Sequence, residues 1–256
     1  MSLTYGIGAM LRFLKGKKRP YTTAVILAGG EGSRMNGAGG VTKQLMSVGG
    51  VPVLVRSLFA FDASEYIDEI VVVARKEEMK EVARLAKMHG VKKLVRIVSG
   101  GETRALSALR GLEAASPKTQ YIAIHDAARC LITPKMIALV ASAAYVTRAA
   151  SAACSSVDTL KLVNTSLEVQ ETLDRESVYR AQTPQIFEIG LYRAAAYSAR
   201  KDGVAATDDN MLVERLGHRV KMVDTGEENI KITRSLDVAI AEAILKVRAE
   251  AKGDTP

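Results

Sequence analysis

The chain has 256 residues, a formal net charge of +8 and 48% hydrophobic side chains, which suffices for one α/β domain and argues against a disordered chain. It has no Trp and only four Phe, too few for a protein that stacks many nucleobases on aromatic side chains. Cys130 and Cys154 lack a metal-ligand spacing, so we expect neither a zinc site nor a disulfide scaffold, and a cytoplasmic location. No apolar run approaches the roughly 20 residues that span a bilayer.

Half of the positive excess lies in a short basic segment, Lys15, Lys17, Lys18 and Arg19. We interpret residues 1–20 as an N-terminal extension and residues 21–256 as the folded domain. The domain itself is only mildly basic, which favours small anionic ligands over nucleic acid.

From Thr23 onward, short apolar runs alternate with segments of helical periodicity. The predicted strands are Thr23–Leu27, Ile70–Ala74, Leu94–Val98 and Tyr121–Ile124. The predicted helices are Pro52–Phe61, Glu77–Met88, Thr103–Ala115 and Pro134–Thr147. This alternation predicts a Rossmann-like α/β fold, with a mainly parallel sheet covered by helices on both faces.

The pattern changes after residue 150. Ala152–Val157 predicts a strand, and Thr159–Leu173 alternates without a helical period around the turn Asn164-Thr165-Ser166. We interpret residues 158–180 as a protruding β-hairpin arm. Such a hairpin is marginal alone, so we expect it to pair with a second subunit in a homodimer; the alternative is an edge hairpin folded onto its own domain. The chain closes with Arg219–Asp224, Asn229–Thr233 and a helix over Leu236–Lys252.

A glycine-rich turn, Ala28-Gly29-Gly30-Glu31-Gly32-Ser33-Arg34-Met35, follows the first predicted strand. Glycines let backbone N–H groups approach an anion, and Arg34 and Lys43 add two cations that suit a triphosphate. No Gly-Lys-Ser/Thr completes a P-loop, and Met35 stands where a dinucleotide fingerprint needs its third glycine. A structural tight turn is the alternative interpretation.

Further motifs follow in order: Lys43-Gln44, Gly100-Gly101-Glu102-Thr103-Arg104, His125-Asp126-Ala127-Ala128-Arg129, Asp158-Thr159-Leu160-Lys161, Thr183-Pro184-Gln185, Thr207-Asp208-Asp209 and Asn229-Ile230-Lys231-Ile232-Thr233. With the glycine turn, this ordered set resembles the 2-C-methyl-D-erythritol 4-phosphate cytidylyltransferases, sugar-phosphate nucleotidyltransferases of the non-mevalonate isoprenoid pathway. The resemblance extends from about Thr23 to Leu245.

The resemblance implies transfer of a cytidylyl group from CTP with release of pyrophosphate, and a role for each matching residue. Arg34 and Lys43 stabilise charge at the reacting phosphorus, Asp126 binds Mg²⁺, and Lys231 and Arg175 hold the sugar phosphate, Arg175 across a dimer interface. The implied CTP-binding residues are Ala28, Gly29, Gly30, Gly32, Gly101, Glu102, Ser107, Ala128 and Arg129. The implied sugar-phosphate contacts also include Thr159, Thr183 and Thr207.

The residues alone leave other interpretations open. Asp126 also suits a helix cap, Arg104 and Arg129 suit solvated charges at helix starts, and Arg175 suits an exposed ion pair with Asp174 or Glu176. His125 we interpret as structural. Three features depart from the family pattern: the glycine-rich stretch Gly37–Gly40 lengthens the loop before Lys43, Glu102 replaces an aspartate, and Cys130 replaces a proline.

Three alternative functions remain at this stage. A ribitol 5-phosphate cytidylyltransferase keeps the chemistry and changes the acceptor. A nicotinamide-dependent Rossmann oxidoreductase would bind its cofactor without releasing pyrophosphate. A basic nucleic-acid-binding module would depend on residues 1–20.

Overall fold

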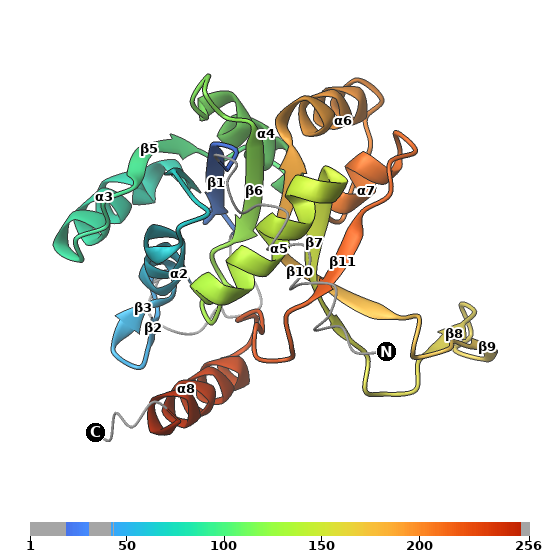
Figure 1. Cartoon of the computed structure of the whole chain (residues 1–256). Helices are drawn as coiled ribbons and strands as arrows, with labels where there is room; N and C mark the ends of the chain where they lie inside the picture. The colour runs from blue at the N-terminus through green and yellow to red at the C-terminus, as the bar shows by residue number, and fades with distance from the viewer. Residues whose placement is uncertain (1–18, 31–41, 43, 252–256) are drawn as a thin grey trace.

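Figure 1 shows the fold of the chain as a computed structural model, which describes residues 19–30, 42 and 44–251. The predicted extension, apart from Arg19 and Pro20, lies outside the described residues. So do the predicted site residues Gly32, Arg34 and Lys43 and the stretch Gly37–Gly40.

A seven-stranded sheet forms the centre of the molecule, in the order β11-β7-β10-β6-β1-β4-β5. Its strands are β1 (Thr22–Leu27), β4 (Glu69–Ala74), β5 (Leu94–Ser99), β6 (Tyr121–Asp126), β7 (Ala149–Ser155), β10 (Tyr179–Glu188) and β11 (Lys221–Asp224). β10 runs antiparallel to β6 and β7, whereas the other neighbouring strands are parallel. The predicted mainly parallel sheet is therefore confirmed.

Helices cover both faces of this sheet, because successive side chains of a buried strand point to opposite faces. The covering helices are α2 (Val53–Ala63), α3 (Met79–Met88), α4 (Arg104–Ala114), α5 (Pro134–Thr147), α6 (Ile189–Lys201) and α7 (Asp209–Glu214). Ala24 and Ile26 of β1 pack in one core cluster with residues of α2, α3 and α5. Val25, between them, packs in the opposite cluster with residues of α4, α6 and α7. The sheet is thus apolar on both sides.

Helix starts follow capping chemistry that the sequence carries. The side chain of Thr103 accepts a hydrogen bond from the backbone N of Leu106 and caps α4, and Thr133 caps α5 in the same way. The side chain of Asp208 accepts from the backbone N of Met211 and caps α7. These caps fix where each helix begins, and α4 begins at the cavity described below.

The remaining elements lie around this body. A short ribbon of β2 (Ser47–Val48) and β3 (Val51–Pro52), the 3₁₀ turn η2 (Lys76–Glu78) and α8 (Ser235–Glu250) complete the body. Residues of β2, α2 and α8 share a third small core with Cys130 and Leu131. None of the described helices has the length and apolar character needed to cross a membrane.

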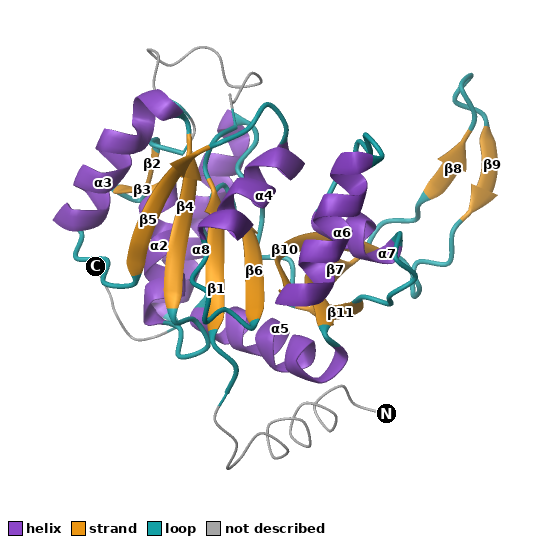
Figure 2. Ribbon diagram, turned by 90° about the horizontal axis from the view of Figure 1, so that it is seen from above, coloured by secondary structure: helices purple, strands orange, loops and turns teal. Residues whose placement is uncertain are grey.

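The predicted hairpin arm is present. β8 (Lys161–Val163) pairs antiparallel with β9 (Val169–Thr172), and Figures 1 and 2 both place the pair away from the sheet. All residues of both strands are exposed, and Leu167 at the tip is 81% exposed. The alternative of a hairpin folded back on its own domain is wrong.

Candidate active site

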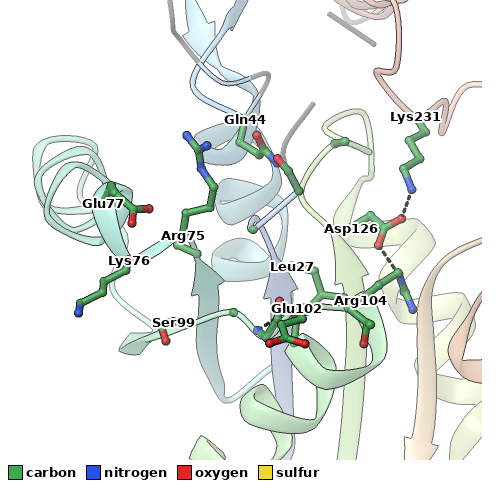
Figure 3. A pocket seen from close by; sticks show the side chains of 18 residues that line it. Leu27, Gln44, Arg75, Lys76, Glu77, Ser99, Glu102, Arg104, Asp126 and Lys231 are labelled. Carbon is green, nitrogen blue, oxygen red and sulfur yellow. Dashed lines mark hydrogen bonds and ion pairs between the residues drawn. The ribbon is translucent and has the colours of Figure 1, made fainter. Parts of the chain in front are cut away.

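A cavity of about 720 Å³ opens where β1, β4, β5 and β6 end, and the last residue of each of these strands lines it. Carboxyl ends of parallel strands are the usual ligand site of open α/β sheets, and this volume suits a nucleotide. Eight predicted site residues line it (Figure 3): Gly29, Gly30, Gly101, Glu102, Ser107, Asp126, Ala128 and Lys231.

One wall of the cavity is the start of α4. The hydroxyl of Ser107 accepts a hydrogen bond from the backbone N of Gly101 at 3.0 Å, which closes the loop before the helix. A Cβ on Gly101 would lie 2.6 Å from the Cβ of Leu106, so only glycine lets the loop pass this close to the helix. The first turn of α4 thereby faces the cavity, and a helix N-terminus favours an anion.

On the opposite side, the glycine turn is held by a residue that sequence reasoning did not select. The side-chain Nε2 of Gln44 donates to the carbonyl oxygen of Gly30 at 2.9 Å. Gln44 is buried and lines the cavity. Its contact holds the carbonyl group of Gly30 in place.

Asp126, at the end of β6, lies between two cations. Its Oδ1 accepts from Nε of Arg104 at 3.1 Å, and its Oδ2 accepts from Nζ of Lys231 at 2.7 Å (Figure 3). Burial alone would raise the pKa of Asp126, but the charges of Arg104 and Lys231 outweigh burial and hold it well below its usual range. The carboxylate is therefore ionised at neutral pH.

Arg104 is held by a second carboxylate. Its Nη1 donates to Oδ2 of Asp209 at 2.6 Å, and only 27% of its side chain is exposed. Burial lowers the pKa of Arg104, whereas Asp209 and Asp126 raise it by a larger amount. The interpretation of Arg104 as a solvated charge at a helix start is wrong, since it bridges two acidic side chains.

Lys231 reaches Asp126 from an irregular segment. Asn229–Thr233 contains no strand, although its composition is β-branched. The backbone N of Ile232 donates to the carbonyl of Ala128 at 2.8 Å. The fully buried side chain of Asn229 donates to the carbonyl of Thr183 at 2.9 Å. These bonds place Lys231 beside Asp126, 105 residues away in sequence.

His125 and Thr183 lie behind the cavity. The hydroxyl of Thr183 accepts from the backbone N of Asp126 at 3.0 Å and bonds Nδ1 of His125 at the same distance. Burial lowers the pKa of His125 to about 3, so its imidazole is neutral. The buried, neutral ring of His125 and its contact with Thr183 support the structural interpretation of His125. The contact of Thr183 with the backbone of Asp126 helps to hold Asp126 in place.

Other predicted site residues do not line the cavity. Ala28 is buried behind it, and Arg129 donates from Nη1 to the carbonyl of Asn229 at 2.8 Å, so Arg129 is not a solvated charge either. Thr159, Arg175 and Thr207 are exposed away from the cavity. Within the described part of the chain, no side chain forms an ion pair with Arg175, so the pairing with Asp174 or Glu176 is wrong.

A glycine turn, a helix N-terminus and charged side chains at the strand ends of a Rossmann-like sheet are typical of an enzyme that binds a nucleotide. Residues 22–247 match the family model described as 2-C-methyl-D-erythritol 4-phosphate cytidylyltransferase. The chain belongs to this family, and the nicotinamide-dependent oxidoreductase alternative is excluded.

Curated relatives of this family align with the chain over most of their length. A protein from Pelotomaculum thermopropionicum named 2-C-methyl-D-erythritol 4-phosphate cytidylyltransferase is 41% identical over 235 residues, which cover 90% of this chain and 98% of the relative. One of the same name from Caldanaerobacter subterraneus is 38% identical over 226 residues, 88% and 98% of the two chains.

A solved structure gives the same result. The 4-diphosphocytidyl-2C-methyl-D-erythritol synthase from Anaerococcus prevotii superposes with a TM-score of 0.79 at 30% identity, covering 88% of this chain and 98% of the other.

Proposed function

We propose that this chain transfers the cytidylyl group of CTP to 2-C-methyl-D-erythritol 4-phosphate and releases pyrophosphate, a step of isoprenoid precursor synthesis. The family match supports the reaction. The observation that carries the site is the position of Asp126 between Arg104 and Lys231 in a nucleotide-sized cavity.

The reaction is an in-line displacement. A phosphate oxygen of the acceptor forms a bond to the α-phosphorus of CTP, while the bond from that phosphorus to the bridging oxygen breaks and pyrophosphate leaves with the electron pair. The attacking phosphate is already anionic at neutral pH, so no general base is required. Positioning and charge stabilisation supply the catalysis.

The roles are those that the resemblance implies. Lys231 and Arg175 hold the acceptor phosphate, while Arg34 and Lys43 stabilise the charge that develops at phosphorus. The role of Lys231 is supported by its position: it lines the cavity, and its ammonium group donates a hydrogen bond to Asp126. Gly101 and Glu102 in the loop before α4, with Ser107 in the first turn of that helix, support a nucleoside site because they lie at the cavity wall. Ala128 would border the same site.

Asp126 fits the Mg²⁺ that the family resemblance implies. No cluster of three His, Cys, Asp or Glu occurs in the described residues, so the ion would depend on Asp126 and on substrate phosphates. Mg²⁺ commonly binds through one carboxylate and phosphate oxygens. The ionised carboxylate keeps lone pairs beyond the two that accept from Arg104 and Lys231. When bound, the ion would neutralise charge on the triphosphate.

The hairpin arm supports a homodimer. Leu162, Leu167 and Val169 expose apolar surface on a two-stranded ribbon that would be marginal alone. Pairing of two arms would cover this surface and carry Arg175 toward the partner's cavity. We expect a dimer by sedimentation and a monomer for the variant Leu162→Glu/Val169→Glu; a dimeric variant would exclude this interface. The two free, buried cysteines suit a cytoplasmic location.

One assay tests the whole proposal. Pyrophosphate release is measured with CTP, ATP, GTP and UTP, each with 2-C-methyl-D-erythritol 4-phosphate and with ribitol 5-phosphate. We expect release with CTP and the branched acceptor. Faster turnover of ribitol 5-phosphate would assign the alternative acceptor, and no release with any pair would refute the proposal.

A further inference from the structure

The motif Thr207-Asp208-Asp209 places an acidic side chain behind the cavity without lining it. Asp209 is the first residue of α7, and its side chain is 1% exposed. The capping of α7 does not require a carboxylate at this position, because Asp208 already supplies the cap.

Both oxygens of the Asp209 carboxylate accept a hydrogen bond. Its Oδ2 accepts from Nη1 of Arg104 at 2.6 Å, and its Oδ1 accepts from the hydroxyl of Tyr192 at 2.5 Å. The backbone N of Asp209 donates to Oε1 of Gln185 at 2.9 Å. Burial, reinforced by Asp209, raises the pKa of Tyr192 well above its usual value, so the phenol remains a donor.

Arg104 connects this buried carboxylate to the cavity. Its Nε donates to Asp126 while its Nη1 donates to Asp209. The guanidinium is planar, so two contacts from different edges fix its plane, which one ion pair would not do. Tyr192 fixes Asp209, Asp209 fixes Arg104, and Arg104 fixes one oxygen of Asp126.

Stability alone does not account for this arrangement. Burying a charged pair rarely stabilises a protein more than apolar side chains of similar volume do. The neighbours of Asp209 on α7, Leu212 and Val213, are apolar core residues. An ionic contact at this point serves an oriented cavity side chain better than it serves the core.

We propose that Asp209 is a positioning residue for cytidylyl transfer: it acts through Arg104 to hold the Asp126 carboxylate in one orientation in the cavity. This inference rests on the proposed function. Asp209 touches no substrate, and its effect falls on the rate of the chemical step more than on CTP binding.

The test compares Asp209→Asn with Asp208→Asn. Both remove one negative charge from the start of α7, but Asp208 contacts Gln185 and Met211 and makes no contact with Arg104. Asparagine remains a good helix cap. We expect kcat of Asp209→Asn to fall on the order of 10-fold, as for supporting residues of other sites, with the KM for CTP within about twofold of wild type. Asp208→Asn should keep wild-type kcat.

A double-mutant cycle separates positioning from a general loss of structure. If Asp209 acts through Arg104, adding Asp209→Asn to Arg104→Gln causes little further loss of kcat. Independent, multiplicative losses would overturn the proposal. Tyr192→Phe is the second variant if Asp209→Asn fails to fold: it keeps the carboxylate, removes one donor and should lower kcat less. An unchanged kcat in Asp209→Asn, or in Tyr192→Phe where Asp209→Asn does not fold, would also overturn it.

A readout without turnover distinguishes this proposal from the proposed function. The Nε–H signal of Arg104 in a ¹⁵N spectrum, assigned by its loss in Arg104→Gln, should be sharp in wild type and Asp208→Asn and broadened in Asp209→Asn. A sharp signal in Asp209→Asn would refute the positioning role even if the enzyme is active. A wild-type chain without pyrophosphate release would refute the proposed function and leave the spectral result intact.

Discussion

Gly111, in the middle of α4, allows this helix to lie directly on the sheet. A Cβ at this position would lie 2.2 Å from Cγ1 of Val25 and 3.1 Å from its Cγ2 and from Cγ2 of Val73. Both valines are fully buried in the core cluster that also contains α4 residues. The substitution Gly111→Ala therefore forces either Val25 out of its rotamer or α4 away from β1.

Two opposing effects set the magnitude. Alanine favours a helix interior over glycine by about 0.5–1 kcal/mol. Overpacking a close-packed core by one methyl group costs about 1–3 kcal/mol. A contact of 2.2 Å is far inside van der Waals distance, so the clash is expected to win, with a net loss of about 1–2 kcal/mol. Because α4 carries Ser107 and Arg104 at its start, a shift of the helix should also raise the KM for CTP.

Urea unfolding measures the net loss of stability, and the KM for CTP measures the effect of a shift of α4 on the cavity. Val25→Ala provides the matched control, because it removes the two Val25 methyl groups, including the one that the new Cβ would approach most closely. The double variant should be more stable than the sum of the two single losses predicts, since the variants relieve each other's defect. A Gly111→Ala chain as stable as wild type, with unchanged KM, would refute the reasoning.

Three further predictions concern other parts of the structure. Asn229→Ala removes the donor to Thr183 and should lower the free energy of unfolding by about 2 kcal/mol and raise the KM for the acceptor through Lys231; an unchanged KM would contradict this. Burial raises the pKa of Asp68, but the contacts with Arg19 and the backbone N of Thr22 lower it by a larger amount, so the net shift is downward. The variant Asp68→Asn should therefore be about 1 kcal/mol less stable than wild type at pH 7, and this difference in stability should shrink below about pH 4. A difference that stays constant down to about pH 2 would exclude the ion pair. Burial raises the pKa of Cys130 to about 11, so native protein should resist iodoacetamide at pH 8 and denatured protein should react; rapid native labelling would show an accessible thiolate.

The sequence predicts the regular half of the fold well. The helix Pro134–Thr147 is found at its predicted bounds. The bounds of β1, β4, β5 and β6 differ from the predicted ones by only one or two residues, because apolar periodicity and capping residues are local signals. β10 was not predicted. It contains Pro184 and polar residues, and its pairing with β7 is interrupted between Ala181 and Gln185, so no alternation marks it as a strand.

The site residues, too, divide into those that local sequence predicts and those that depend on a distant partner. Glycines and strand-end residues such as Gly101 and Asp126 were predicted, because their role depends on local backbone and on the end of a strand. For Arg104 the sequence leaves a solvated charge open as an alternative, since its partner Asp209 lies 105 positions later in the chain. Nothing local distinguishes an arginine at a helix start that contacts solvent from one that bridges two carboxylates.

The charge balance of the group around Asp126 shows what these four side chains can and cannot do for a triphosphate. Asp126 and Asp209 carry two negative charges, and Arg104 and Lys231 carry two positive charges, so this group is neutral as a whole. A neutral group fixes orientation but does not attract a ligand of about four negative charges. An incoming phosphate can recruit Lys231, which is 37% exposed, more readily than Arg104, which a buried carboxylate retains. Attraction for the triphosphate must come from cations outside this group: Arg75 and Lys76 also line the cavity, and the family resemblance implies Arg34, Lys43 and Mg²⁺.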